Sequence, residues 1–127
     1  MRLLLDTHVF LWACGETAQL QIHLREAIES ETNAVFVSAA SAWEIAIKRE
    51  AGRLNFPIHR WDELIEAMGF DTVPMTPAHA IEAGALPRHH LDPFDRMLVA
   101  QARLDGMILA TKDRWIKAYD VTVFKAG

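Results

Sequence analysis

The fold is decided by residues 34–51, whose sequence is AVFVSAASAWEIAIKREA. The stretch begins with Ala34-Val35-Phe36-Val37, a short apolar run typical of a strand that is covered on both faces. The run ends at Ser38, and residues 39–51 have the apolar spacing of a helix that Gly52 ends. A buried strand that leads directly into a helix is the repeating unit of a parallel α/β fold.

Short apolar runs and helical patterns alternate along the rest of the chain. Further apolar runs of this kind occur at residues 3–5, 71–74, 107–110 and 121–124. Segments with helical spacing lie between them, at residues 18–30, 61–68, 77–85 and 93–104. Parallel strands are joined by crossover helices that cover the faces of their sheet. The alternation therefore predicts an α/β fold with a central, mostly parallel five-stranded sheet.

The composition describes one soluble globular domain over residues 1–127, with 51% hydrophobic and 24% charged residues. Cys14 is the only cysteine, which excludes an internal disulfide and a cysteine-based zinc site. The single cysteine predicts a reducing, cytoplasmic location. No apolar stretch approaches the ~20 residues of a membrane-spanning helix, so we expect no membrane partner. The net charge of −4 argues against a broad basic surface for nucleic acid. The net charge is compatible with a small acidic site that binds phosphates through metal ions.

Several carboxylates fall where ligands bind in a parallel sheet, beyond the carboxyl ends of the strands. Asp6 and Asp113 follow predicted strands, Glu44 lies early in the helix after the second strand, and two more acids begin the helix at 93–104. These candidate residues are Asp6, Glu44, Asp92, Asp95 and Asp113. Gathered carboxylates repel one another unless protons or cations neutralise them. Mg²⁺ and Mn²⁺ prefer such oxygen ligands and activate water in phosphodiester cleavage, so the residues predict metal-dependent phosphodiester hydrolysis.

Each candidate acid also has a purely structural interpretation. Asp92 is a favourable N-cap ahead of Pro93, while Asp95, in the first turn, faces back toward the start of the helix. Glu44 has Lys48 four residues on as a surface partner. Asp6 suits the cap of a helix that starts at Thr7, and Asp113 suits a cap or turn. The spacing alone leaves both interpretations open for every acid.

Hydroxyl and basic side chains accompany the acids. Ser38 and Thr111 directly follow strands, where they either cap a helix or support a metal ligand. A basic rim around an acidic centre would position a nucleic-acid backbone, and solvated surface is the alternative for each of its members. The candidates for substrate contact are Arg88, His89, His90 and Arg96.

Four segments together resemble the PIN-domain family, and most closely its VapC-type toxins from bacterial toxin–antitoxin pairs. The segments, in chain order, are Leu3-Leu4-Leu5-Asp6-Thr7-His8, Ser38-Ala39-Ala40-Ser41-Ala42-Trp43-Glu44-Ile45, the stretch from His90 through Asp92-Pro93-Phe94-Asp95-Arg96 to Ala102, and Thr111-Lys112-Asp113. They span nearly the whole chain. The resemblance implies a three-layer α/β/α sandwich.

The resemblance also implies an activity and a site. The activity is that of a ribonuclease dependent on Mg²⁺ or Mn²⁺, with Asp6, Glu44, Asp95 and Asp113 as its catalytic, metal-binding quartet. Small polar residues that assist in the family match Thr7, Ser38 and Thr111, and Asp92 matches a capping or supporting acid. The implied partners are an RNA substrate, a second copy of the chain, and a VapB-like antitoxin whose tail covers the acidic groove.

Two other functions compete with this prediction. A non-catalytic binding module would use the same acidic groove only to receive a basic partner segment. A phosphoryl-transfer domain with an aspartate nucleophile fits less well, because its first strand should be followed by Asp-x-Asp where this chain has Asp6-Thr7-His8. The sequence does not discriminate between the nuclease and the binding module.

Overall fold

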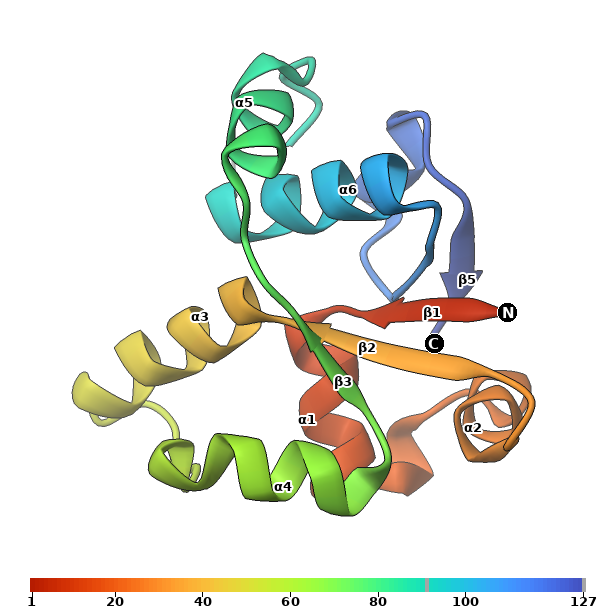
Figure 1. Ribbon diagram of the computed structural model, residues 1–127, viewed down its shortest axis with the longest axis vertical. Helices are drawn as coiled ribbons and strands as arrows, with labels where there is room; N and C mark the ends of the chain where they lie inside the picture. Colours follow the sequence, from red (N-terminus) through yellow and green to blue (C-terminus); the bar gives the residue numbers. More distant parts are fainter. Residues whose placement is uncertain (91, 127) are drawn as a thin grey trace.

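A five-stranded parallel sheet forms the centre of the protein in the computed structural model, which describes residues 1–90 and 92–126 (Figure 1). Its strand order is β3-β2-β1-β4-β5, and every neighbouring pair is parallel. The strands are β1 (Arg2–Leu5), β2 (Ala34–Ser38), β3 (Asp71–Val73), β4 (Ile108–Thr111) and β5 (Val123–Lys125). Each lies within two residues of a predicted apolar run. The sheet confirms the predicted α/β class.

Helices cover both faces of the sheet and make the predicted three layers (Figure 1). The α-helices are α1 (Thr7–Gly15), α2 (Ile22–Glu29), α3 (Ala39–Glu50), α4 (Trp61–Met68), α5 (Pro77–Ala85) and α6 (Pro93–Asp105). Short 3₁₀ turns are η1 (Thr17–Gln19), η2 (Ile58–Arg60) and η3 (Arg114–Ala118). In Figure 1, α1, α2 and α4 lie on one side of the sheet, and α5 and α6 lie on the other. Among the described residues, no helix has the length and apolar character needed to cross a membrane.

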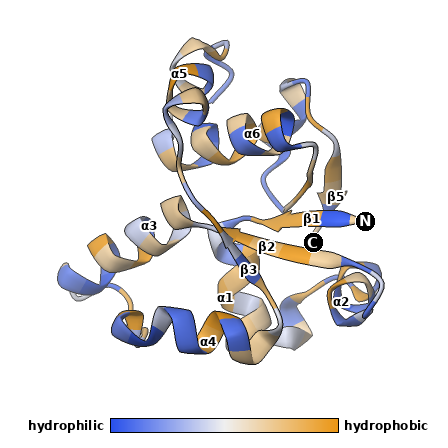
Figure 2. Ribbon diagram, in the orientation of Figure 1, coloured by the Kyte–Doolittle hydropathy of each residue, from blue (hydrophilic) through white to orange (hydrophobic). Residues whose placement is uncertain are grey.

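The leucines of β1 hold the strand between the two helical layers. Leu3 and Leu5 pack with Phe10 of α1 on one face, and Leu4 packs with Leu98 of α6 on the other. All five side chains are fully buried, and burial of each stabilises the fold by roughly 2 kcal/mol. Figure 2 shows most of β1 and β2 in hydrophobic colours, as expected for central strands. The end of β1, where Asp6 follows, is therefore fixed from both sides.

One predicted helix is divided in the structure. The pattern at 18–30 predicts a continuous helix, but η1 and α2 are separated by extended backbone at Leu20 and Gln21. The Gln21 backbone N–H donates to the carbonyl of Ala126 at 3.1 Å, and the Gln21 side chain caps α2 by accepting from the Leu24 N–H. The prediction of one helix here is wrong because a contact with the far end of the chain ends the first turn.

Candidate functional site

A pocket of about 440 Å³ opens at the carboxyl edge of the sheet, beyond β1 and β4. Its walls include acids from four separate segments: Asp6, Glu44, Asp95 and Asp113. The cations Lys48, Lys112 and Arg114 also line it. The fold thus brings together the predicted quartet, because the carboxyl ends of parallel strands meet at one edge. Asp92 is absent from the lining residues.

Asp6 links the sheet to α1 and faces the pocket at the same time. Its backbone N–H donates to the Ala110 carbonyl at 3.0 Å, and its Oδ1 accepts from the Val9 N–H at 2.7 Å. The carboxyl is buried, and this burial raises its pKa above the ordinary value, while a hydrogen bond from Thr111 opposes the shift. Asp6 is therefore an N-cap and also an acid that is costly to ionise without a cation.

Asp92 and Asp95 have different places at the start of α6. Asp92 is the N-cap, and its Oδ1 accepts from the Asp95 backbone N–H at 3.0 Å. The Asp95 side chain instead lines the pocket. The pKa of Asp95 is raised to about 6, chiefly by burial; a hydrogen bond with His90 opposes this rise, and the nearby charges of Asp92 and Asp6 add to it. Between these two acids, Asp95 is the one available to a ligand.

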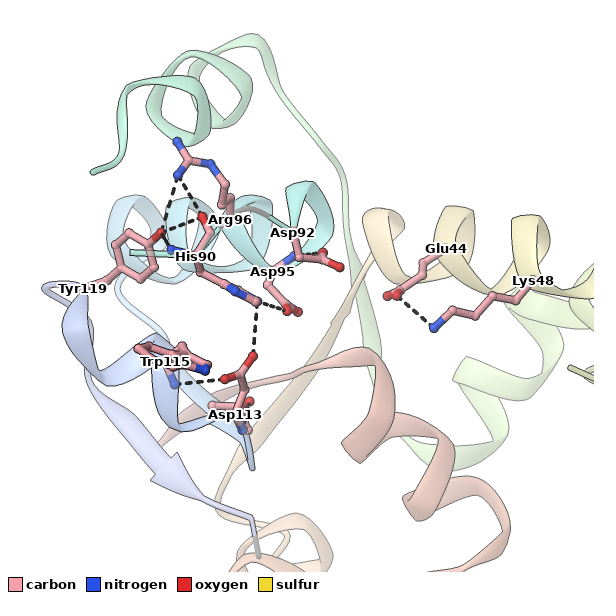
Figure 3. Close-up of polar contacts among 10 residues, drawn as sticks. Glu44, Lys48, His90, Asp92, Asp95, Arg96, Asp113, Trp115 and Tyr119 are labelled. Atoms are coloured by element: carbon pink, nitrogen blue, oxygen red, sulfur yellow. Dashed lines mark hydrogen bonds and ion pairs between the residues drawn. The ribbon is translucent and has the colours of Figure 1, made fainter. Parts of the chain in front are cut away.

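His90 joins two of the pocket acids (Figure 3). Its Nε2 lies 2.7 Å from Asp95 Oδ2 and 3.2 Å from Asp113 Oδ2. One ligand atom from each of these three residues lies within 4.8 Å of the other two. The sequence analysis placed His90 among the residues for substrate contact, and the structure places it inside the acidic cluster. In the sequence, the only indication that His90 belongs to this cluster was its position two residues before Asp92.

Glu44 and Asp113 complete the acidic wall. Glu44 points from α3 toward the side of the pocket where Asp95 lies, and its Oε2 pairs with Lys48 Nζ at 3.1 Å (Figure 3). The Glu44 side chain is 14% exposed and that of Lys48 is 40% exposed, so the pair lies at the pocket margin. Asp113 also caps η3, where its Oδ1 accepts from the Trp115 N–H at 2.9 Å. Both acids have their predicted structural partners and still line the pocket.

The predicted hydroxyl residues form hydrogen bonds within and between the segments that carry the acids. Ser38 caps α3 by accepting from the Ala40 N–H at 2.9 Å. Thr111 Oγ1 accepts from the Asp113 backbone N–H at 3.0 Å. Thr7 lines the pocket and donates to Ser41 Oγ at 2.9 Å. All three side chains are buried.

The remaining residues predicted for substrate contact differ in their exposure to solvent. Arg88 and His89 are exposed, and the His89 ring lies edge-on to Tyr119 with centroids 5.1 Å apart. Arg96 is half-buried, and its guanidinium donates to the carbonyls of Ala83 and Leu86 at 2.9 Å each. Neither Arg88, His89 nor Arg96 is among the pocket-lining residues.

Several pocket residues escaped the sequence analysis because η3 has no apolar pattern of its own. Arg114 and Trp115 of η3 line the pocket, and Trp115 is 58% exposed. Lys112 also lines it and lies over the Trp12 ring, with its Nζ 4.8 Å from the ring centroid. Their position directly after the fourth predicted strand could have identified them as pocket residues.

The fold and the site define a class: a three-layer α/β/α protein with clustered carboxylates at the carboxyl edge of a parallel sheet. The PIN domain family matches residues 3–121, and the chain belongs to this family. The chain is 35% identical to Ribonuclease VapC22 of Mycobacterium tuberculosis over 119 residues, which are 91% of this chain and 90% of that protein.

Solved structures share the fold at low sequence identity. A chain in the crystal structure of VapBC2 from Rickettsia felis, bound to a DNA fragment from their promoter, superposes with a TM-score of 0.74 at 11% identity and covers 100% of both chains. A chain in the DNA-bound VapBC structure from Salmonella typhimurium gives a TM-score of 0.72 at 15% identity, with 98% of each chain covered. These likenesses extend over the entire domain.

Proposed function

We propose that this PIN-domain protein is a metal-dependent endoribonuclease and the toxin of a toxin–antitoxin pair. The observation that carries the proposal is the gathering of Asp6, Glu44, Asp95 and Asp113 around one pocket. The similarity to a protein named Ribonuclease VapC22 supports RNA as the substrate. The four acids outnumber the three lysine and arginine residues that line the pocket, and like-charged carboxylates held together there favour the binding of a cation before RNA phosphates approach.

The donor set fits a hard divalent cation such as Mg²⁺ or Mn²⁺. Asp6, Asp95 and Asp113 offer carboxylate oxygens, with Glu44 at the margin. Burial raises the pKa values of Asp6 and Asp95, so a bound cation would favour their charged forms. When bound, the cation supplies Lewis-acid stabilisation and a lowered pKa of bound water. The chain therefore has residues suited to hold the ion.

The protein's own groups would orient the reactants. Ionised carboxylates accept hydrogen bonds from an attacking water and can take its proton, while Lys112 and Arg114 hold the RNA backbone at the pocket edge. In-line attack of water on phosphorus would leave 5′-phosphate and 3′-hydroxyl ends. The exposed Trp115 ring beside the acids offers a stacking surface for an unpaired base.

The proposed partners follow from the same pocket. An antitoxin with a basic segment would neutralise the acids and block access to RNA. The fold likeness to chains from VapBC structures of Rickettsia felis and Salmonella typhimurium supports a VapB-like antitoxin for this chain. A homodimer is the assembly we propose for the toxin itself.

The test is cleavage of a total-RNA pool by partner-free protein in Mn²⁺, in Mg²⁺ and in EDTA. We expect cleavage in the presence of metal, none in EDTA, and none by Asp95→Asn with either metal. Asp120→Asn is the matched control, because Asp120 is exposed and precedes β5 at the opposite edge of the sheet. A folded wild-type protein that cleaves nothing with either metal would overturn the proposal in favour of a binding module.

A further inference from the structure

We infer that His90 is a nitrogen ligand of the metal centre, together with the carboxylates of Asp95 and Asp113, and that it makes the centre favour transition-metal ions such as Mn²⁺ over Mg²⁺. This inference rests on the proposed function, since it concerns the ion of that same site. It assigns to His90 a role that the acidic quartet does not include.

The first argument is the spacing of the ligand atoms. His90 Nε2 lies 2.7 Å from Asp95 Oδ2 and 3.2 Å from Asp113 Oδ2 (Figure 3). Neighbouring ligand atoms in an octahedral shell with bonds of ~2.1 Å are separated by about 3 Å. The imidazole nitrogen therefore sits about one octahedral edge from each carboxylate oxygen. The three atoms have the separations needed to share one ion.

The second argument is that both the N–H and the carbonyl of the His90 backbone are hydrogen-bonded. Its N–H donates to the Tyr119 hydroxyl at 2.8 Å, and its carbonyl accepts from Tyr119 Oη at 3.1 Å and from Arg96 Nη1 at 3.2 Å. The Tyr119 side chain is buried, and Arg96 is anchored on the end of α5. These contacts use only the backbone of His90, so they fix the point from which the imidazole projects and leave its Nε2 to the two carboxylates.

The third argument is ligand chemistry. Mg²⁺ is bound almost entirely through oxygen, whereas first-row transition ions accept imidazole nitrogen readily. Replacing one oxygen position by Nε2 therefore disfavours Mg²⁺ relative to Mn²⁺. The remaining acids of the pocket, Asp6 and Glu44, offer oxygen donors alone.

The test measures metal binding directly, without RNA. Metal-free protein is titrated with Mn²⁺ alone, free ion is followed by electron paramagnetic resonance, and Mg²⁺ is then added as competitor. We expect His90→Ala to weaken Mn²⁺ binding by at least ~10-fold and to weaken Mg²⁺ binding much less. Electron spin echo modulation of bound Mn²⁺ should show a coordinated imidazole ¹⁴N in the wild type and none in His90→Ala.

Matched variants identify the source of the nitrogen. His8 also lines the pocket, so His8→Ala should keep the nitrogen signal, and His23→Ala, an exposed residue of α2, should leave Mn²⁺ affinity unchanged. Tyr119→Phe should keep the nitrogen signal but weaken Mn²⁺ binding, because the imidazole is retained while its support is lost. Circular dichroism verifies that each variant is folded.

The outcomes distinguish this inference from the proposed function. Wild-type protein that binds Mn²⁺ without a nitrogen signal, or His90→Ala with unchanged selectivity between Mn²⁺ and Mg²⁺, overturns the role of His90 and leaves a metal-dependent nuclease intact. Failure of wild-type protein to bind either ion, together with RNA cleavage that is absent or unaffected by EDTA, overturns the metal-dependent function itself.

Discussion

Asp95 donates its backbone N–H to Asp92 Oδ1 at 3.0 Å, so the two acids of one short segment are fixed in different environments. The bond holds the Asp92 side chain over the first turn of α6, where it satisfies a free backbone donor. The Asp95 side chain is left to face the pocket beside His90 and Asp113. Two neighbouring carboxylates therefore divide capping and ligand binding between them.

Substitutions at Asp92 should report on helix capping. Asp92→Ala removes the cap, and we expect a loss of about 1 kcal/mol in the free energy of unfolding, whereas Asp92→Asn retains the accepting oxygen and most of the stability. RNA cleavage by Asp92→Asn should fall far less than cleavage by Asp95→Asn. Denaturant unfolding and the total-RNA assay measure the two effects. Equal loss of cleavage in both Asn variants would show that Asp92 is also a ligand.

Removing the Asp95 charge should stabilise the metal-free protein at neutral pH. Burial holds the pKa of Asp95 at about 6 in the folded protein, against an ordinary value of 3.8. Between these values the folded state keeps a proton that the unfolded chain releases, so stability decreases as the pH rises from about 4 to about 6 and stays lower above that. At ~1.4 kcal/mol per pKa unit, reduced for partial exposure, Asp95→Asn should gain roughly 1–3 kcal/mol at pH 7.5.

Thermal unfolding in EDTA across pH 4 to 8 measures this effect. The difference in Tm between Asp95→Asn and wild type should be smallest at pH 4, where the folded protein keeps Asp95 protonated and the unfolded chain has only begun to release its proton, and should reach several degrees above pH 6. Asp120→Asn, at the opposite edge, should show no such pH dependence. A difference that is constant across the whole range would contradict the assignment of the raised pKa to Asp95.

The sequence was sufficient to predict the sheet and the edge at which the acids gather. Leu3, Leu4 and Leu5 are apolar without alternation, which is typical of a strand buried on both faces, and Asp6 follows them directly. Once the strands are parallel, topology alone places Asp6 and Asp113 at the same edge. These inferences need only local patterns and a general rule of chain connection.

The contacts that the sequence did not reveal are tertiary and depend on loops. The break before α2 depends on Ala126, more than 100 residues from Gln21 in the chain. The imidazole of His90 reaches Asp113 from a backbone that Tyr119 and Arg96 hold by hydrogen bonds. Hydrophobic periodicity reports burial of side chains and contains no information on such polar contacts between loops.

Asp6 combines capping and pocket roles in one side chain, and two substitutions separate them. Asp6→Asn keeps an oxygen that accepts from the Val9 N–H. It also removes a buried carboxyl group whose pKa is raised by burial, so the protein should be at least as stable as wild type at pH 7.5. Asp6→Ala loses the cap, which costs about 1 kcal/mol relative to Asp6→Asn. Both variants should lose RNA cleavage. Denaturant unfolding compared with cleavage shows whether the two roles separate in this way.

Arg96 should behave as a structural residue. Its guanidinium donates to the carbonyls of Ala83, Leu86 and Pro87 at 2.9, 2.9 and 3.0 Å, and lysine lacks the planar fork needed to reach them together. Arg96→Lys should lower the free energy of unfolding by about 2 kcal/mol. It retains the positive charge, so a direct electrostatic role in RNA binding would predict little change in stability instead. Chemical denaturation monitored by tryptophan fluorescence gives the answer.

Arg114 is the cation that we expect to contact the RNA backbone. It is exposed, it lines the acidic pocket, and it lies beside Asp113 in the chain. RNA affinity is measured at several salt concentrations in the Asp95→Asn background, which prevents cleavage. If Arg114 neutralises one phosphate, Arg114→Gln should reduce the slope of log affinity against log salt by about 0.7. Lys117→Gln is the matched control, because Lys117 is an exposed cation of the same η3 turn that does not line the pocket. An unchanged slope in Arg114→Gln would show that the RNA backbone takes another course, since a lost phosphate contact must release fewer counterions whatever the RNA sequence.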